Sequence, residues 1–172
     1  MSGGHTLSVL LQNELVTLNR AFGMLRRRNL SIKSIAVGPS ASPGLARLTI
    51  MMQTDQATAD RTAKQLDKVV GVREVAAFPS RDGVTRELAL VKVRPGEARY
   101  AELLDVALLY KAAIVDESPE AVILEVSGPE AFVLSFLRAL ERFDVLDVAR
   151  SGAVALERAP ATAQLTLTSE TV

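Results

Sequence analysis

The sequence has no cysteine, no tryptophan and a single histidine, His5. Without cysteine the chain has no disulfides, no thiolate metal ligands and no cysteine nucleophile. A Ser-His-Asp triad would have to use His5, which begins the first predicted strand, and we interpret it as a solvated strand residue. We therefore expect no catalytic residues, no metal site and no cofactor on this chain.

Net charge is lacking as well, because 20 basic residues are balanced by 20 acidic residues. Such a chain is not steered toward nucleic acid or an anionic membrane surface. Aromatic residues make up only 4% of the sequence, too few for the base-stacking surface of an RNA-binding domain. No uncharged apolar run is close to ~18 residues, the length needed to span a bilayer. The first residues do not resemble a signal peptide. We expect a cytoplasmic protein that binds neither nucleic acid nor membranes.

What the sequence does contain is one order of predicted elements that occurs twice. Residues 5–78 are patterned as strand, helix, strand, strand, helix, strand, and residues 86–156 repeat that order. Each half fits the split βαβ arrangement, with both helices on one face of an antiparallel sheet. We predict an α+β fold of tandem ferredoxin-like βαββαβ units, with domains at 5–78 and 86–157, a linker at 79–85 and a flexible tail at 158–172.

Helices are predicted from apolar residues at helical spacing and from end signals. Asp55 can cap the second helix, Pro129 suits the first position of the fourth, and Gly152 indicates a bend in the extended segment 145–156. The predicted buried stripes are Leu18, Ala21, Phe22 and Leu25; Ala59, Ala63, Leu66 and Val70; Ala101, Leu104 and Leu108; and Val133, Phe136, Leu137 and Leu140.

One turn is a candidate binding site. Residues 13–17 join the first strand to the N-terminus of the first helix, where unpaired backbone N–H groups attract a carboxylate. Asn13 can offer its side-chain amide to a ligand or cap the helix. The residue type alone favours capping.

Four segments, spaced in order along the chain, resemble the small regulatory subunit of acetohydroxyacid synthase (acetolactate synthase). They are residues 8–14 (SVLLQNE), 32–37 (IKSIAV), 86–93 (RELALVKV) and 148–152 (VARSG). The resemblance implies an N-terminal ACT domain and a second ACT-like domain. It also implies a non-catalytic chain that forms a homodimer and activates a separate catalytic subunit, which holds thiamine diphosphate, magnesium and FAD. Feedback inhibition by branched-chain amino acids, chiefly valine, is implied too.

The resemblance places the effector between two ACT domains. One chain contributes the turn of Asn13, Glu14, Leu15, Val16, Thr17 and Leu18, and the other contributes Ile32, Ser34 and Val37. The family has glycine in this turn where this chain has Val16, a bulky β-branched residue that restricts the backbone. We therefore expect valine to bind weakly, or a different effector to replace it.

Two functional classes remain open from the sequence. The first is the regulatory subunit of acetohydroxyacid synthase, docked on its catalytic subunit as a homodimer. The second is a free-standing ACT-type sensor that controls another enzyme or a transcription factor. An enzyme in its own right lacks the residues to carry out a reaction.

Overall fold

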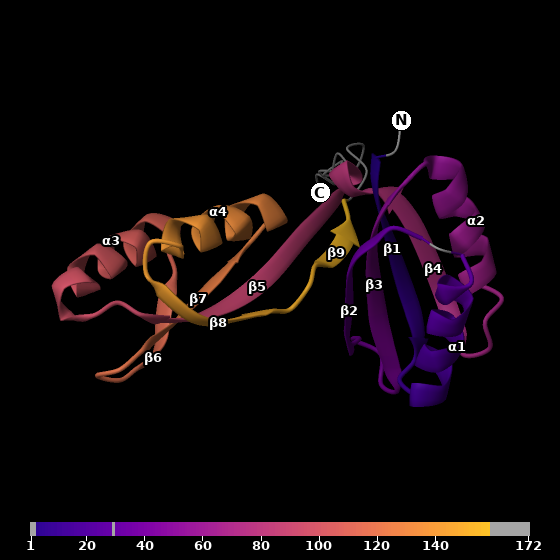
Figure 1. Ribbon diagram of the computed structural model, residues 1–172. Coiled ribbons are helices and arrows are strands. Elements are labelled where there is room, and N and C mark those ends of the chain that lie inside the picture. The colour runs from indigo at the N-terminus through magenta and orange to yellow at the C-terminus, as the bar shows by residue number, and fades with distance from the viewer. Residues whose placement is uncertain (1–2, 29, 159–172) are drawn as a thin grey trace, which may run out of the picture.

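The computed structural model describes residues 3–28 and 30–158, and they form two βαββαβ units (Figure 1). The first unit comprises β1 (Gly3–Gln12), α1 (Leu15–Arg26), β2 (Ile32–Pro39), β3 (Leu45–Thr54), α2 (Gln56–Leu66) and β4 (Val72–Pro79). Its strands form one antiparallel sheet in the order β2-β3-β1-β4. The predicted flexible tail falls, apart from Arg158, outside the described residues.

The second unit repeats this plan and adds a strand. It comprises β5 (Gly83–Arg94), α3 (Tyr100–Tyr110), β6 (Ala113–Glu117), β7 (Val122–Gly128), α4 (Glu130–Leu140), β8 (Asp144–Arg150) and β9 (Val154–Glu157). The sheet order is β6-β7-β5-β8, and β9 pairs with the start of β5. The predicted tandem ferredoxin-like fold is confirmed.

Alternation along the central strands determines which face of each sheet is buried. In β1, Leu7, Val9 and Leu11 are fully buried beneath α1 and α2, and the intervening residues belong to the opposite face. In β5, residues 87, 89, 91 and 93 are buried in the same way, and the residues between them are exposed. This two-residue period is that of a strand with its two faces in different surroundings.

The buried stripe predicted for α3 is wrong. The helix buries Leu103, Val106 and Ala107, and it exposes Leu104 and Leu108. The sequence of this helix is apolar around most of its circumference, so helical periodicity does not select one face. The stripe predicted for α4 is confirmed, since Val133, Phe136 and Leu140 are buried and Leu137 packs against them.

Three predictions at helix ends have different outcomes. Asp55 caps α2, accepting a hydrogen bond from the Thr58 N–H at 2.7 Å, and this bond lowers the pKa of its carboxyl group. Pro129 is the N-cap of α4 rather than its first residue. Val70 is exposed because α2 ends at Leu66 and leaves it outside the helical face. These errors come from helix boundaries, which periodicity locates only within a few residues.

His5 is buried, so its interpretation as a solvated residue is wrong. Its Nδ1 lies 3.0 Å from the Thr54 carbonyl oxygen, and its Nε2 lies 3.0 Å from the side-chain oxygen of Gln56. The ring thus joins β1 to the start of α2. A buried polar side chain with hydrogen-bond partners has a structural role.

The two units are joined closely. After Pro79, one turn of 3₁₀ helix at Ser80–Asp82 leads directly into β5. Residues 83–86 pair with 157–154 of β9, and the Arg158 N–H donates to the Asp82 carbonyl at 2.9 Å. The predicted final extended segment is therefore two strands, separated at residues 151–153, where Gly152 has a φ of +72°. The bend expected at Gly152 is confirmed.

A partly buried ion pair joins β8 to β5. The Arg150 guanidinium donates from Nε to Glu87 Oε1 at 2.5 Å and from Nη2 to Oε2 at 2.8 Å. The side chain of Glu87 is 5% exposed and that of Arg150 is 35% exposed. Hydrogen bonding to Glu87 raises the pKa of Arg150 above its ordinary value. This two-pronged geometry is the strong form of an arginine–carboxylate contact.

Candidate functional site

The turn between β1 and α1 leaves backbone N–H groups at the start of the helix. The Glu14 carbonyl accepts from the Thr17 and Leu18 N–H groups, each at 3.1 Å. The N–H groups of Leu15 and Val16 belong to the first turn, where a helix offers them no internal acceptor. Together with the positive end of the helix dipole, they form a place for a carboxylate.

Asn13 does not cap this helix, contrary to the prediction. The N-cap is Glu14, whose side chain makes no capping hydrogen bond. Asn13 precedes the N-cap, and its backbone N–H donates to the Gly44 carbonyl of the β2–β3 hairpin at 2.9 Å. The helix therefore begins without a side-chain cap, which leaves the first amides accessible to a ligand.

Gly71 packs against the turn between β1 and α1, a contact that the sequence analysis missed. Its carbonyl accepts from the Gln12 N–H at 2.8 Å, and its φ is +95°. A Cβ there would lie 2.6 Å from Thr17 Oγ1 and 2.8 Å from Gln12 Oε1. Thr17 is fully buried, and its Oγ1 has no hydrogen-bond partner in the described part of the chain. The sequence signal for Gly71 is a glycine soon after the end of a helix.

Replacing Gly71 by alanine is expected to destabilise the first unit by at least about 2 kcal/mol. A left-handed backbone costs a non-glycine residue ~1–2 kcal/mol, and overpacking of the Thr17 contact adds ~1–3 kcal/mol. Urea unfolding of the two proteins measures the difference. Gly23→Ala is the matched control: nothing lies within 4 Å of its Cβ position in α1, so this change should be neutral or stabilising. Equal losses for both variants would contradict the close contact at Gly71.

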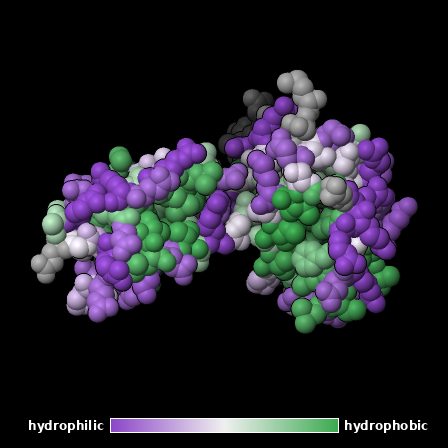
Figure 2. Space-filling view, in the orientation of Figure 1, coloured by the Kyte–Doolittle hydropathy of each residue, from purple (hydrophilic) through white to green (hydrophobic). Residues whose placement is uncertain are grey.

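The other predicted half of the site lies on β2, at the edge of the first sheet. Register places Ile35 opposite Ile50 and Val37 opposite Leu48, and a bulge brings Ile32 opposite Met52, so all three lie on the face that carries the helices. We call Ile32, Ile35 and Val37 the β2 edge. Each is partly exposed (36–44%), and Figure 2 shows apolar surface over β2 and β3.

Ser34 lies on the opposite face of the sheet, in register with Met51. Its Oγ accepts a hydrogen bond from the Ala153 N–H of the second unit at 3.4 Å. Next to it, a Cβ at Gly152 would lie 3.2 Å from the Ile35 carbonyl oxygen. Within one chain Ser34 therefore contacts the second unit. It does not lie with the turn residues Asn13–Leu18.

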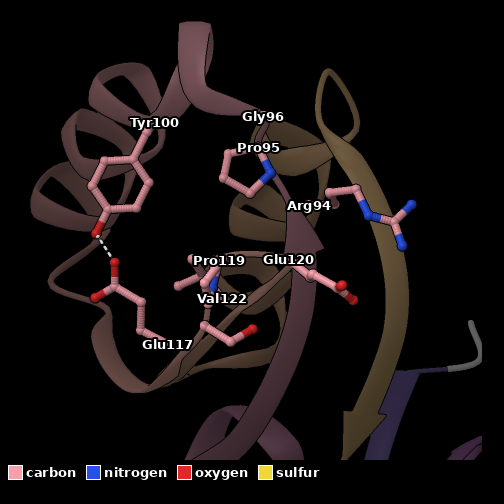
Figure 3. A pocket seen from close by; sticks show the side chains of 9 residues that line it. Arg94, Pro95, Gly96, Tyr100, Glu117, Pro119, Glu120 and Val122 are labelled. Atoms are coloured by element: carbon pink, nitrogen blue, oxygen red, sulfur yellow. Dashed lines mark hydrogen bonds between the residues drawn. The ribbon is translucent and has the colours of Figure 1, made fainter.

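A separate cavity of about 590 Å³ lies at the far end of the second unit. Figure 3 shows Tyr100 and Glu117 side by side on its wall, joined by a hydrogen bond of 2.6 Å from the tyrosine hydroxyl. This bond raises the pKa of Tyr100. Arg94 on the other wall pairs with Asp144 at 3.0 Å. None of its lining residues belongs to the predicted effector site.

Residues 3–28 and 30–158 offer neither a cluster of metal ligands nor a membrane-spanning helix. They contain no group of three or more histidine, aspartate or glutamate side chains arranged to hold a metal ion. Their helices include none that is long and apolar enough to cross a membrane.

The fold is that of an ACT domain followed by a second ferredoxin-like domain. Family models agree in both halves: residues 7–74 match "AHAS small subunit-like ACT domain", and residues 86–159 match "Small subunit of acetolactate synthase". The chain belongs to the acetolactate synthase small-subunit family. It is a non-catalytic, regulatory subunit, as the sequence had led us to expect.

Individual relatives match along nearly the whole chain. The probable acetolactate synthase small subunit of Methanothermobacter thermautotrophicus is 35% identical over 155 residues, covering 90% of this chain and 92% of that protein. The acetolactate synthase small subunit of Mycobacterium bovis is 33% identical, covering 91% and 93%. The crystal structure of the small subunit from Thermotoga maritima has a TM-score of 0.85 at 33% identity, covering 91% of this chain and 98% of that chain.

Proposed function

We propose that this chain associates with the catalytic subunit of acetohydroxyacid synthase and raises its activity. The observation that carries this proposal is the match to acetolactate synthase small subunits through both units in order, over 90% of the chain. The fold is consistent with a role that depends on contact, because its exposed apolar residues lie on helix and strand surfaces that a partner can cover.

The direct test mixes the purified chain with its catalytic subunit and measures acetolactate formation. The chain alone should form none, and the catalytic subunit should gain turnover in proportion to the chain added until a fixed ratio is reached. Co-purification of the two proteins from the native cell provides a second readout. A catalytic subunit that neither binds the chain nor responds to it would instead favour the free-standing sensor.

We further propose that two copies pair through the β2 edge and complete an effector site. β2 forms a ladder with β3 in this chain, and its outer side is an unpaired edge within the described structure. Pairing with a second copy satisfies such an edge and covers its apolar side chains. It brings Ile32 and Val37 of one copy toward the Asn13–Leu18 turn of the other. A branched-chain amino acid held there would have its carboxylate at the Leu15 and Val16 amides.

Val16 is expected to weaken valine binding at this turn, and Val16→Gly to strengthen it about tenfold. The residue lies inside α1 with helical backbone, so strain in the turn is absent and the effect comes from its side chain. That side chain is 47% exposed beside the amides, where its methyl groups occupy ligand space. Overpacking costs ~1–3 kcal/mol, and ~1.4 kcal/mol is a tenfold change in affinity.

Calorimetry with valine, leucine and isoleucine on both proteins measures this difference. Leu15→Ala is a useful comparison, because Leu15 is the neighbouring bulky residue and is more exposed. Tight micromolar valine binding by the unmodified chain, with no gain from glycine, would contradict the assignment of Val16.

The domain boundaries at 5–78 and 86–157 and the cytoplasmic location stay predictions.

A further inference from the structure

A cleft of about 660 Å³ lies between the two units, on the side of the first sheet away from α1 and α2. One wall comes from β2, β3 and the hairpin between them, and the other comes from β5 and β9; Figure 1 places β9 beside β2. Its volume lies within the range of small-molecule sites, ~300–1,000 Å³. The effector site proposed above involves the turn before α1 and the other face of this sheet, and the two places share only Val37 at the β2 edge.

Two arginines line the cleft, one from each unit, and no aspartate or glutamate lies among its described lining residues. Arg47 on β3 donates from Nη1 to the buried Ser8 hydroxyl at 2.6 Å, and Arg86 on β5 donates from Nη1 to the Thr85 carbonyl at 2.8 Å. Both acceptors are neutral, and neither guanidinium forms an ion pair with a described residue. Each guanidinium has five N–H donors, so donors and charge remain for an anion.

The remaining walls are largely apolar. Val84, Val154 and Leu156 of the second unit line the cleft, and all three are exposed hydrophobic residues in this chain. A ligand with a short branched aliphatic chain would remove their apolar surface from water, which is favourable in proportion to the area covered. A bare inorganic anion would leave that surface exposed.

We propose that this interdomain cleft binds a small monocarboxylate with a branched aliphatic chain and no amino group, such as a branched-chain 2-oxo acid. The carboxylate pairs with Arg47 and Arg86, and the aliphatic chain packs on the valine and leucine walls. An α-amino acid is disfavoured, because its ammonium group would enter beside two guanidinium groups without an acidic side chain to neutralise it. The cleft thus selects against the ligand class proposed for the β1–α1 turn.

The test uses calorimetry on the full chain with 3-methyl-2-oxobutanoate, which has the carbon skeleton of valine without its amino group. Binding is expected in the unmodified chain, and Arg47→Met and Arg86→Met should each weaken it about tenfold or more. Arg61→Met is the matched control, because Arg61 lies exposed on α2 and bonds to Thr58. That variant should bind as the unmodified chain does.

Several outcomes overturn the proposal. They are no binding of the oxo acid at millimolar concentration, binding by both cleft variants that is as tight as that of the unmodified chain, competition by valine at the same arginines, or equally tight binding of inorganic phosphate. Arg86 is exposed, so its variant remains informative if Arg47→Met disturbs the fold. Oxo-acid binding that appears only after residues 159–172 are removed also overturns it, since the cleft would then belong to the chain's own C-terminal segment. These readouts are independent of the catalytic subunit.

Discussion

Replacing Arg150 by methionine is expected to destabilise the second unit by about 3 kcal/mol. The substitution leaves the Glu87 carboxylate almost fully buried without its two hydrogen bonds from the guanidinium. Breaking a buried ion pair on one side typically costs ~3–5 kcal/mol, and the lower end applies because Arg150 retains partial exposure to water. Chemical unfolding followed by circular dichroism measures the loss.

A matched control lies on the same two strands. Arg94 and Asp144 also pair between β5 and β8, at 3.0 Å, but their side chains are 55% and 59% exposed. Exposed pairs contribute ~0–1 kcal/mol, so Arg94→Met should change stability little. The double variant Glu87→Gln with Arg150→Met should recover part of the loss, since it removes the uncompensated charge. Equal effects of Arg94→Met and Arg150→Met would show that burial of Glu87 is not decisive.

Replacing both Ile35 and Val37 by lysine is expected to convert the proposed dimer into a monomer. Both side chains lie on the β2 edge, and a two-fold interface would contain each lysine twice. Charges of one sign on an edge strand oppose strand addition, since they must lose water or meet each other. A rise of at least about 100-fold in the dimer dissociation constant is expected, which is ~2.8 kcal/mol.

Analytical ultracentrifugation over a range of concentrations measures that constant. Val70→Lys is the control, because Val70 is an exposed valine between α2 and β4, away from β2. It should leave the association unchanged. A doubly substituted chain that still sediments as a tight dimer would place the interface elsewhere. The activation assay on the same variants then shows whether dimerisation is needed for the effect on the catalytic subunit.

Local sequence signals were sufficient for most of the fold. Alternation in β1 and β5 and the Asp55 cap are short-range features, and the structure confirms each of them. Local sequence signals failed at α3, where apolar residues surround the helix and only packing against the sheet selects Leu103 over Leu104. β9 was also missed as a separate strand, because its pairing with the start of β5 depends on two segments about seventy positions apart.

The candidate site was harder to anticipate. The turn at residues 13–18 was recognised from its position before a helix, but the absence of a cap at Asn13 depends on the hydrogen bond to Gly44. Gly71 contacts the turn from a distant part of the sequence, and only the folded chain shows that its missing side chain makes room for Thr17. The cleft between the units requires both units in place, so neither repeat alone indicates it.

The pairing of β9 with the start of β5 has a mechanical consequence. The second unit is connected to the first through two antiparallel chain segments, one entering and one returning, that are hydrogen-bonded along residues 83–86 and 154–157. A two-stranded ribbon resists shear in its own plane, since shear would break its ladder, whereas bending out of the plane leaves every rung intact. Thermal motion of one unit relative to the other is therefore expected to follow bending, which opens and closes the cleft between β2 and β9, rather than in-plane shear.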